Sequence, residues 1–233
     1  MPGRHGMPYV LGIDVSTTAT KAVLLDEAGR VRGIGISEYG FEVPRPLWSE
    51  QEPALWWDAA ISAIRSVLHT SAVVGDDIEA IGLTGQMHGL VLLDAADRVL
   101  RPAILWNDQR TASECDAIRA VIGPDRLIAI TGNDAVTGLT APKLVWVRDH
   151  EPETWRQVAH VLLPKDYVRL RMTGFGGDFG QDKGVDVATG ADQVEIGGRS
   201  FFCRMHVAEI LRPIDNPELL VSCGELEDLL IGR

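Results

Sequence analysis

The chain has 233 residues, of which 45% are hydrophobic and 24% charged, with a net charge of −11. This composition is typical of a globular protein long enough to bury a core, as one large domain or two small ones. No basic block interrupts the acidic background, which argues against binding along a nucleic-acid backbone. Three separated cysteines, no apolar leader and no run of ~18 apolar residues predict a cytoplasmic protein without membrane contact.

The first part of the chain predicts three strands followed by a helix. Residues 8–15 and 20–26 are β-rich runs separated by a Ser/Thr patch, and residues 31–41 can form a third strand. Their connections are short, so we expect an antiparallel meander. From Pro53 onward apolar side chains recur at helical spacing, and proline suits the first turn of a helix.

The middle of the chain predicts strands that alternate with helices. The expected elements are a strand over 78–83, a hairpin of 90–93 with 99–105, and helices over 111–121, 142–149 and 165–172. This order predicts an α/β domain with helices covering a mixed sheet. The glycine-rich stretch 175–200 predicts a loop, a linker or disorder, and short helix-like pieces follow in 201–233.

The first candidate site is the segment that starts at Asp14, DVSTTATK. A carboxylate ends a buried strand there, and hydroxyl-bearing residues form the turn into the next strand. Such a hairpin can bring hydroxyl and N–H groups to phosphate oxygens while the carboxylate holds the water shell of a metal. The alternative is a hydrophilic turn in which Asp14 binds its own backbone.

The second candidate is TGQMHG, residues 84–89, directly after an apolar strand. His88 could bind a ligand or could simply be a structural histidine. Gly85 and Gly89 favour the ligand interpretation, because glycines permit close backbone approach at a strand end.

The third candidate is LWNDQRT, residues 105–111. Trp106 could cover the apolar side of a sugar, while Asn107 and Asp108 bind its hydroxyl groups. Alternatively, Trp106 packs in the core and Asp108 caps the following helix.

Taken in order, the segments resemble the N-terminal domain of the FGGY carbohydrate kinases, most closely the bacterial xylulokinases. The similarity covers residues 8–174, and one piece fits the first signature of the family. The matching signature residues are Gly138, Thr140, Lys143, Leu144, Trp146, Val147, Asp149 and His150. The resemblance implies an actin-like, ribonuclease-H-like domain of an enzyme that uses ATP and Mg²⁺ to phosphorylate a ketopentose, with D-xylulose as the expected sugar.

The resemblance also implies roles for single residues. Asp14 would be the catalytic acidic residue that positions magnesium through its water shell. Thr17, Thr18 and Lys21 would bind the phosphates of ATP. The pair Met87 and His88 would contact the sugar, and Trp106, Asn107 and Asp108 would line the same cleft.

The resemblance ends near residue 174. The family carries its catalytic aspartate, the general base, in a later Gly-Asp-Asn segment, and no counterpart occurs in 175–233; Asp215-Asn216 lacks the glycines. We therefore expect a truncated kinase domain over 8–174 with a divergent or frame-disrupted tail, inactive alone and prone to form a homodimer through an apolar face. The alternatives are a non-catalytic sugar-binding pseudo-kinase, a kinase for another pentulose or polyol, and an actin-like ATPase.

Overall fold

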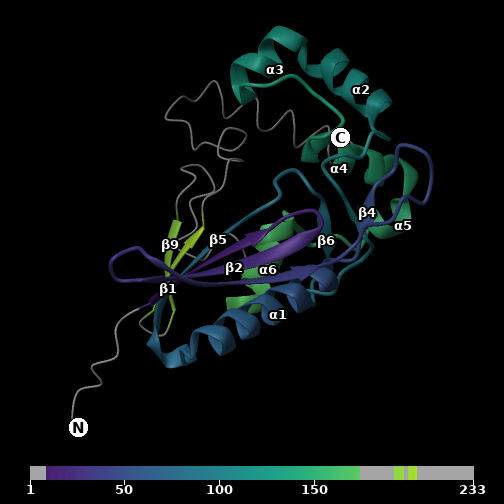
Figure 1. Ribbon diagram of the computed structural model, residues 1–233. Coiled ribbons are helices and arrows are strands. Elements are labelled where there is room, and N and C mark those ends of the chain that lie inside the picture. The colour runs from purple at the N-terminus through teal and green to yellow at the C-terminus, as the bar shows by residue number, and fades with distance from the viewer. Residues whose placement is uncertain (1–8, 174–191, 197–198, 204–233) are drawn as a thin grey trace.

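The structure is a computed structural model that describes residues 9–173, 192–196 and 199–203 (Figure 1). The strands are β1 (Tyr9–Val15), β2 (Ala19–Asp26), β3 (Val31–Glu38), β4 (Glu50–Gln51), β5 (Ile78–Gly85), β6 (Val91–Leu93), β7 (Ala103–Ile104), β8 (His160–Leu162), β9 (Asp192–Ile196) and β10 (Arg199–Cys203). The helices are α1 (Pro53–Ser71), α2 (Ala112–Ile122), α3 (Pro124–Thr131), α4 (Thr140–His150), α5 (Pro152–Trp155) and α6 (Pro164–Thr173), with a short 3₁₀ turn, η1 (Gly75–Asp77).

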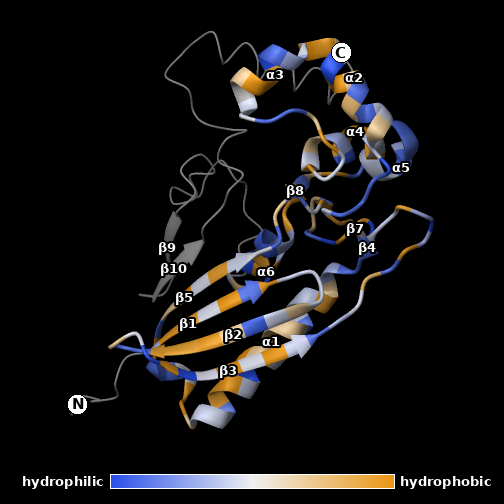
Figure 2. Ribbon diagram, turned by 45° about the horizontal axis from the view of Figure 1, so that its top comes forward, coloured by the Kyte–Doolittle hydropathy of each residue, from blue (hydrophilic) through white to orange (hydrophobic). Residues whose placement is uncertain are grey.

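The main sheet has the strand order β3-β2-β1-β5-β10-β9. Strands β1, β2 and β3 form the predicted antiparallel meander, and β5 returns through α1 to pair parallel with β1. Because β1 and β5 run in the same direction, the loops that follow them lie at the same end of the sheet. Helices α2 to α5 gather beyond that end, away from the six-stranded sheet (Figures 1 and 2). The prediction of a mixed sheet flanked by helices is confirmed.

One face of the sheet is covered by α1 and α6. Apolar residues alternate along β1 and β2 and pack against the apolar stripe of α1, which is visible in Figure 2. The buried side chains of this core include Leu11, Ile13, Val15, Ala22, Leu24, Trp56, Ala60, Ala63 and Val67. Helix α1 begins at Pro53, as predicted, and crosses close to β3, where a Cβ on Gly35 would clash with the carbonyl oxygen of Ala63. The close packing of α1 on this face therefore follows from side-chain alternation and from glycines of β3 that leave room for the helix.

The predicted hairpin of 90–93 with 99–105 forms, although as single bridges. Leu93 bridges Val99 and Leu90 bridges Ile104, while the longer pairings join β6 to β8 and β7 to β4. The sequence analysis missed β4, β8 and α3. The helix α3 was missed because Gly123 and Pro124 interrupt the pattern, and here they end one helix and begin the next.

The prediction of a loop, linker or disorder over 175–200 is wrong where the structure describes those residues. Strand β9 covers 192–196, and β10 pairs parallel with β5 from Ser200 to Cys203. Glycines on both sides obscured these short strands in the sequence. Apart from residues 201–203, which are in β10, the helix-like pieces predicted for 201–233 lie outside the described residues.

Candidate functional site

The carboxylate of Asp14 lies on the sheet face that α1 does not cover. Directly paired residues project to the same side of a sheet, and Asp14 is paired with Lys21 on β2 and Thr84 on β5. All three line an open groove of about 560 Å³. The Ser16 hydroxyl donates a hydrogen bond to Asp14 at 2.7 Å. A carboxylate, an ammonium and a hydroxyl thus share one concave surface at the end of β1.

Side chains from other parts of the chain hold the turn between β1 and β2 by hydrogen bonds to its carbonyl oxygens. The amide of Gln51 donates to the carbonyl oxygen of Thr17 at 2.9 Å and itself accepts from the indole of Trp56 at 2.6 Å. The phenol of Tyr39 donates to the carbonyl oxygen of Ser16 at 2.6 Å. Burial raises the pKa of Tyr39 to about 12. These bracing residues were missed by the sequence analysis, because their partners lie far away along the chain.

The TGQMHG segment continues directly from β5. The backbone N–H of Gln86 donates to the carbonyl oxygen of Val15 at 2.8 Å, so this loop starts beside the end of β1. A Cβ on Gly85 would lie 2.7 Å from that same oxygen, and one on Gly89 would lie 2.5 Å from Pro164. The predicted close approach of two backbones occurs at Gly85, whereas Gly89 packs against the ring of Pro164. Between them, His88 adopts a left-handed backbone with φ of 67°.

A buried ammonium group holds the loop at His88. Lys143 on α4 is fully buried, and its Nζ donates to the carbonyl oxygens of His88 at 2.8 Å and Gly138 at 2.5 Å. Burial lowers the pKa of Lys143 to about 7, partly opposed by the negative charge of Asp108. Burial and then the charge of Lys143 lower the pKa of His88. The imidazole therefore favours its neutral form, which can both donate and accept a hydrogen bond.

Trp106 connects the third candidate segment to the first. Its side chain is 50% exposed, and its indole N–H donates to the Thr17 hydroxyl at 2.9 Å across 89 residues of sequence. The structure therefore brings the predicted sugar-covering indole and the predicted phosphate turn into direct contact. Met87 and His88 are not among the residues that line the groove beside Asp14 in the described part of the chain.

Two side chains near these loops have buried polar atoms without protein partners. Among the described residues, Oδ1 of Asn107 and both amide atoms of Gln86 are buried and make no hydrogen bond. Unpaired buried polar atoms are costly, and a bound ligand rich in hydroxyl groups could satisfy them. Gln86 was not singled out from the sequence, although it lies inside the quoted motif.

Asp108 is buried and engaged by protein groups, which favours a structural role over its predicted contact with the sugar. Its side chain is completely buried, and Oδ2 accepts from Arg110 at 2.7 Å and from the N–H of Ser49 at 2.6 Å. Arg110 also pairs with Glu50 at 2.7 Å and stacks on Trp48, with 3.7 Å from Cζ to the ring centroid. A carboxylate whose two oxygens both accept hydrogen bonds and which has no exposed surface is typical of a structural group.

No cluster of three or more His, Cys, Asp or Glu side chains suited to a metal occurs within residues 9–173, 192–196 and 199–203. Asp14 is a single partly exposed carboxylate in an open groove. That arrangement fits Mg²⁺, which keeps most of its water and binds through one or two carboxylates and the phosphates of a substrate.

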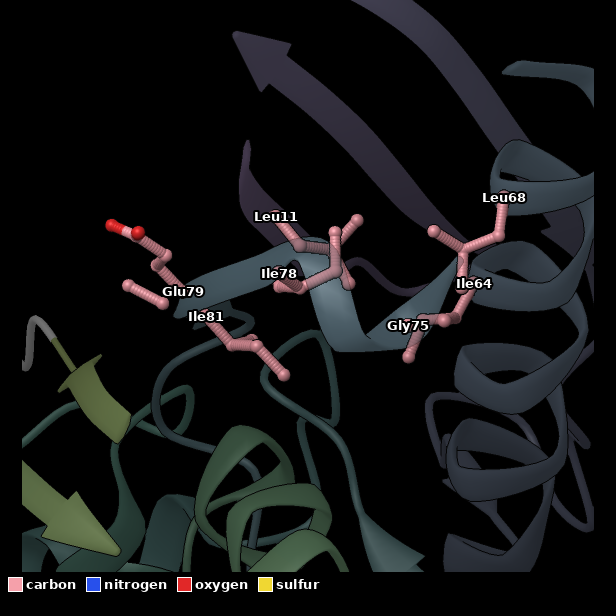
Figure 3. A pocket seen from close by; sticks show the side chains of 8 residues that line it. Leu11, Ile64, Leu68, Gly75, Ile78, Glu79 and Ile81 are labelled. Carbon is pink, nitrogen blue, oxygen red and sulfur yellow. The ribbon is translucent and has the colours of Figure 1, made fainter. Parts of the chain in front are cut away.

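A second hollow, of about 180 Å³, lies at the opposite end of the sheet (Figure 3). It is lined mainly by apolar residues of α1, β1 and β5, among them Leu11, Ile64, Leu68 and Ile78, while the Glu79 carboxylate points away from them. Because it lacks converging polar groups, it offers no chemistry. Within the described part of the chain no helix is both long and apolar enough to span a membrane.

The chain is similar to known sugar kinases over most of its length. The N-terminal domain of the FGGY family of carbohydrate kinases matches residues 9–192, which confirms the predicted resemblance and extends it beyond residue 174. The xylulose kinase of Escherichia coli is 48% identical over 76% of this chain, and that of Bacillus subtilis is 45% identical over 72%. The chain spans 37% and 34% of the lengths of these two relatives.

Solved structures show the same fold. The xylulose kinase from Rhodospirillum rubrum has a TM-score of 0.69 at 31% identity, covering 77% of this chain and 36% of the other. A xyloylose kinase from Brucella ovis has a TM-score of 0.64 at 43% identity, covering 71% and 34%. The predicted actin-like fold is thus confirmed by sugar kinases of that architecture. The chain belongs to the FGGY family of carbohydrate kinases.

Proposed function

We propose that this chain supplies the sugar-facing part and the first phosphate turn of a kinase that converts D-xylulose and ATP into D-xylulose 5-phosphate and ADP. One observation carries the proposal: the hydrogen bond between the Trp106 indole and the Thr17 hydroxyl. Phosphoryl transfer requires the acceptor sugar to lie beside the terminal phosphate. An indole that covers a sugar and also contacts a phosphate-binding hydroxyl meets that requirement.

On the phosphate side, the proposed groups are Thr17, Thr18, Lys21 and Asp14. The exposed Lys21 ammonium and the turn between β1 and β2 would bind the phosphate oxygens of ATP. Asp14 would hold the water shell of Mg²⁺, and that ion would neutralise charge on the transferred phosphate. The Ser16 hydroxyl, 2.7 Å from Asp14, keeps the carboxylate oriented.

On the sugar side, Met87, His88, Trp106 and Asn107 are the proposed contacts. The half-exposed indole offers an apolar face, and the unpaired amide atoms of Asn107 and Gln86 suit hydroxyl groups. The relatives named above support xylulose as the sugar. Asp108 acts only by supporting this wall.

The transfer step also needs a base that takes the proton of the acceptor hydroxyl. The family places that aspartate in a Gly-Asp-Asn segment, which does not occur in these 233 residues. A second possibility for the chain by itself is a module that binds sugar without chemistry. A cytoplasmic location and a homodimer also stay predictions from the sequence.

Calorimetry with D-xylulose, glycerol and gluconate, followed by measurement of ADP release, tests these proposals. We expect selective binding of D-xylulose and no ADP release above the uncatalysed rate. The variants His88→Ala and Trp106→Ala should each weaken binding at least ~10-fold, which corresponds to about 1.4 kcal/mol. Val136→Ala, at an exposed apolar position, is the control. Binding of glycerol or gluconate in preference to D-xylulose would overturn the proposed substrate.

A further inference from the structure

We propose that Lys143 is a positioning residue of the sugar site, which sets the backbone of His88 and its distance from Trp106 by binding two carbonyl oxygens from inside the protein. This role goes beyond the direct sugar contacts, and it rests on the proposed function only for its effect on sugar affinity. The family signature contains this lysine but says nothing of what the side chain holds.

The contacts of Lys143 explain why a cation is buried there. Its side chain is fully buried, and both hydrogen bonds that its Nζ donates end on backbone carbonyl oxygens, those of His88 and Gly138. A buried ammonium without such partners would be strongly unfavourable. The side chain therefore replaces the water that would otherwise solvate these two carbonyl groups in a loop.

The first carbonyl belongs to the residue whose conformation needs support. His88 has a φ of 67°, a left-handed conformation that residues other than glycine adopt only under strain. The hydrogen bond to its carbonyl oxygen fixes the peptide plane between His88 and Gly89. The tight contact of Gly89 with Pro164 restrains the loop on the other side. Fixing this backbone determines where the imidazole points.

The second carbonyl links the same ammonium to the opposite wall of the site. Gly138 lies against the backbone of Trp106, because a Cβ added to it would be 2.9 Å from the Trp106 carbonyl oxygen. A single amine thus ties the His88 loop to the segment that packs on Trp106. The separation of the two predicted sugar contacts then depends on two hydrogen bonds that share one nitrogen atom.

Charged and titratable neighbours of Lys143 are Asp108, Arg110, Cys115 and His88. Asp108 is the negative group among them, and it is already shared with Arg110. The two carbonyl dipoles therefore hold Lys143, and its position depends on these hydrogen bonds more than on an ion pair.

The test uses Lys143→Met, which keeps the shape of the side chain and removes the donor. Thr131→Val is the matched control, because the Thr131 hydroxyl also lies between two backbone carbonyl oxygens, those of Leu127 at 3.0 Å and Asn133 at 2.8 Å. In the sugar-free chain, NMR coupling constants report the φ of His88, and a pH titration reports its ring pKa. We expect Lys143→Met alone to move His88 out of the left-handed region and to raise its ring pKa, since a positive neighbour is lost. Unchanged values in Lys143→Met would overturn the proposal.

Sugar affinity separates this proposal from the proposed function. If the parent chain binds D-xylulose, Lys143→Met should bind it at least ~10-fold more weakly and Thr131→Val should bind it equally well. Equal affinity of Lys143→Met and the parent would overturn the positioning role. If the parent does not bind D-xylulose while the NMR changes appear, the substrate is wrong and the positioning of His88 stands.

A measurement on the unsubstituted chain covers the case in which Lys143→Met fails to fold. Resonances of the Lys143 side chain and the His88 carbonyl carbon are followed between about pH 5 and about pH 9. We expect the carbonyl-carbon signal of His88 to shift at the pH at which Lys143 loses its proton, because a neutral amine donates a weaker hydrogen bond than an ammonium. A His88 carbonyl signal that does not follow this step would overturn the proposal.

Discussion

Replacing Asp108 with asparagine separates the two roles that this residue could have. The substitution keeps the shape of the side chain and removes its charge, which leaves the buried guanidinium of Arg110 with Glu50 as its ion-pair partner. Loss of one partner of a buried ion pair typically costs about 3–5 kcal/mol. Because Glu50 remains 2.7 Å away, we expect a loss of about 3 kcal/mol in the free energy of unfolding, at the low end of that range.

Urea denaturation followed by tryptophan fluorescence measures this loss. Asp94→Asn is the matched control, because Asp94 accepts from the backbone and side chain of Arg98 in the same manner, but Arg98 is 80% exposed. We expect a much smaller effect there, since water replaces a surface partner. At a temperature where both variants are folded, D-xylulose affinity should change little. A stable Asp108→Asn variant that loses sugar affinity would refute the scaffold role and restore the role as a direct ligand.

Three further predictions concern the sheet and two shifted pKa values. Gly35→Ala should lower the free energy of unfolding by about 1–3 kcal/mol, because its Cβ would meet the backbone of α1. Gly82→Ala should lower it little, since no atom lies within 4 Å of the added Cβ. Thermal unfolding measures both variants, and equal losses would contradict the packing. Burial in the folded state lowers the pKa of Lys143 from 10.5 to about 7, so the folded protein binds that proton more weakly than the unfolded chain. The free energy of unfolding should therefore rise from pH ~7 towards pH ~10. Denaturation curves of Lys143→Met should lack this rise. Ultraviolet titration should show one phenol that ionises only near pH 12, and this ionisation should be missing from Tyr39→Phe. An ionisation near pH 12 that persists in Tyr39→Phe would contradict its assignment to Tyr39.

Local sequence patterns determined the first elements of this protein. Alternating apolar residues predicted β1 to β3, and helical spacing after Pro53 predicted α1, because each pattern reports which side of an element faces the core. Gly85, the first glycine of TGQMHG, correctly predicted a close backbone approach at the end of β5, since only a residue without Cβ fits there. The three candidate segments and the signature residues, taken in order, were also enough to predict the family.

Only the tertiary structure decided which distant groups meet each candidate side chain. Asp108 was predicted to be a sugar ligand beside Trp106, whereas the structure pairs its carboxylate with the backbone of Ser49, 59 residues away, which favours a structural role. Lys143 meets His88 across 55 residues, and Trp106 meets Thr17 across 89. The sequence places a polar group on an element through local backbone preference. Its partner, and therefore its role, depends on how distant elements pack, which no local spacing contains.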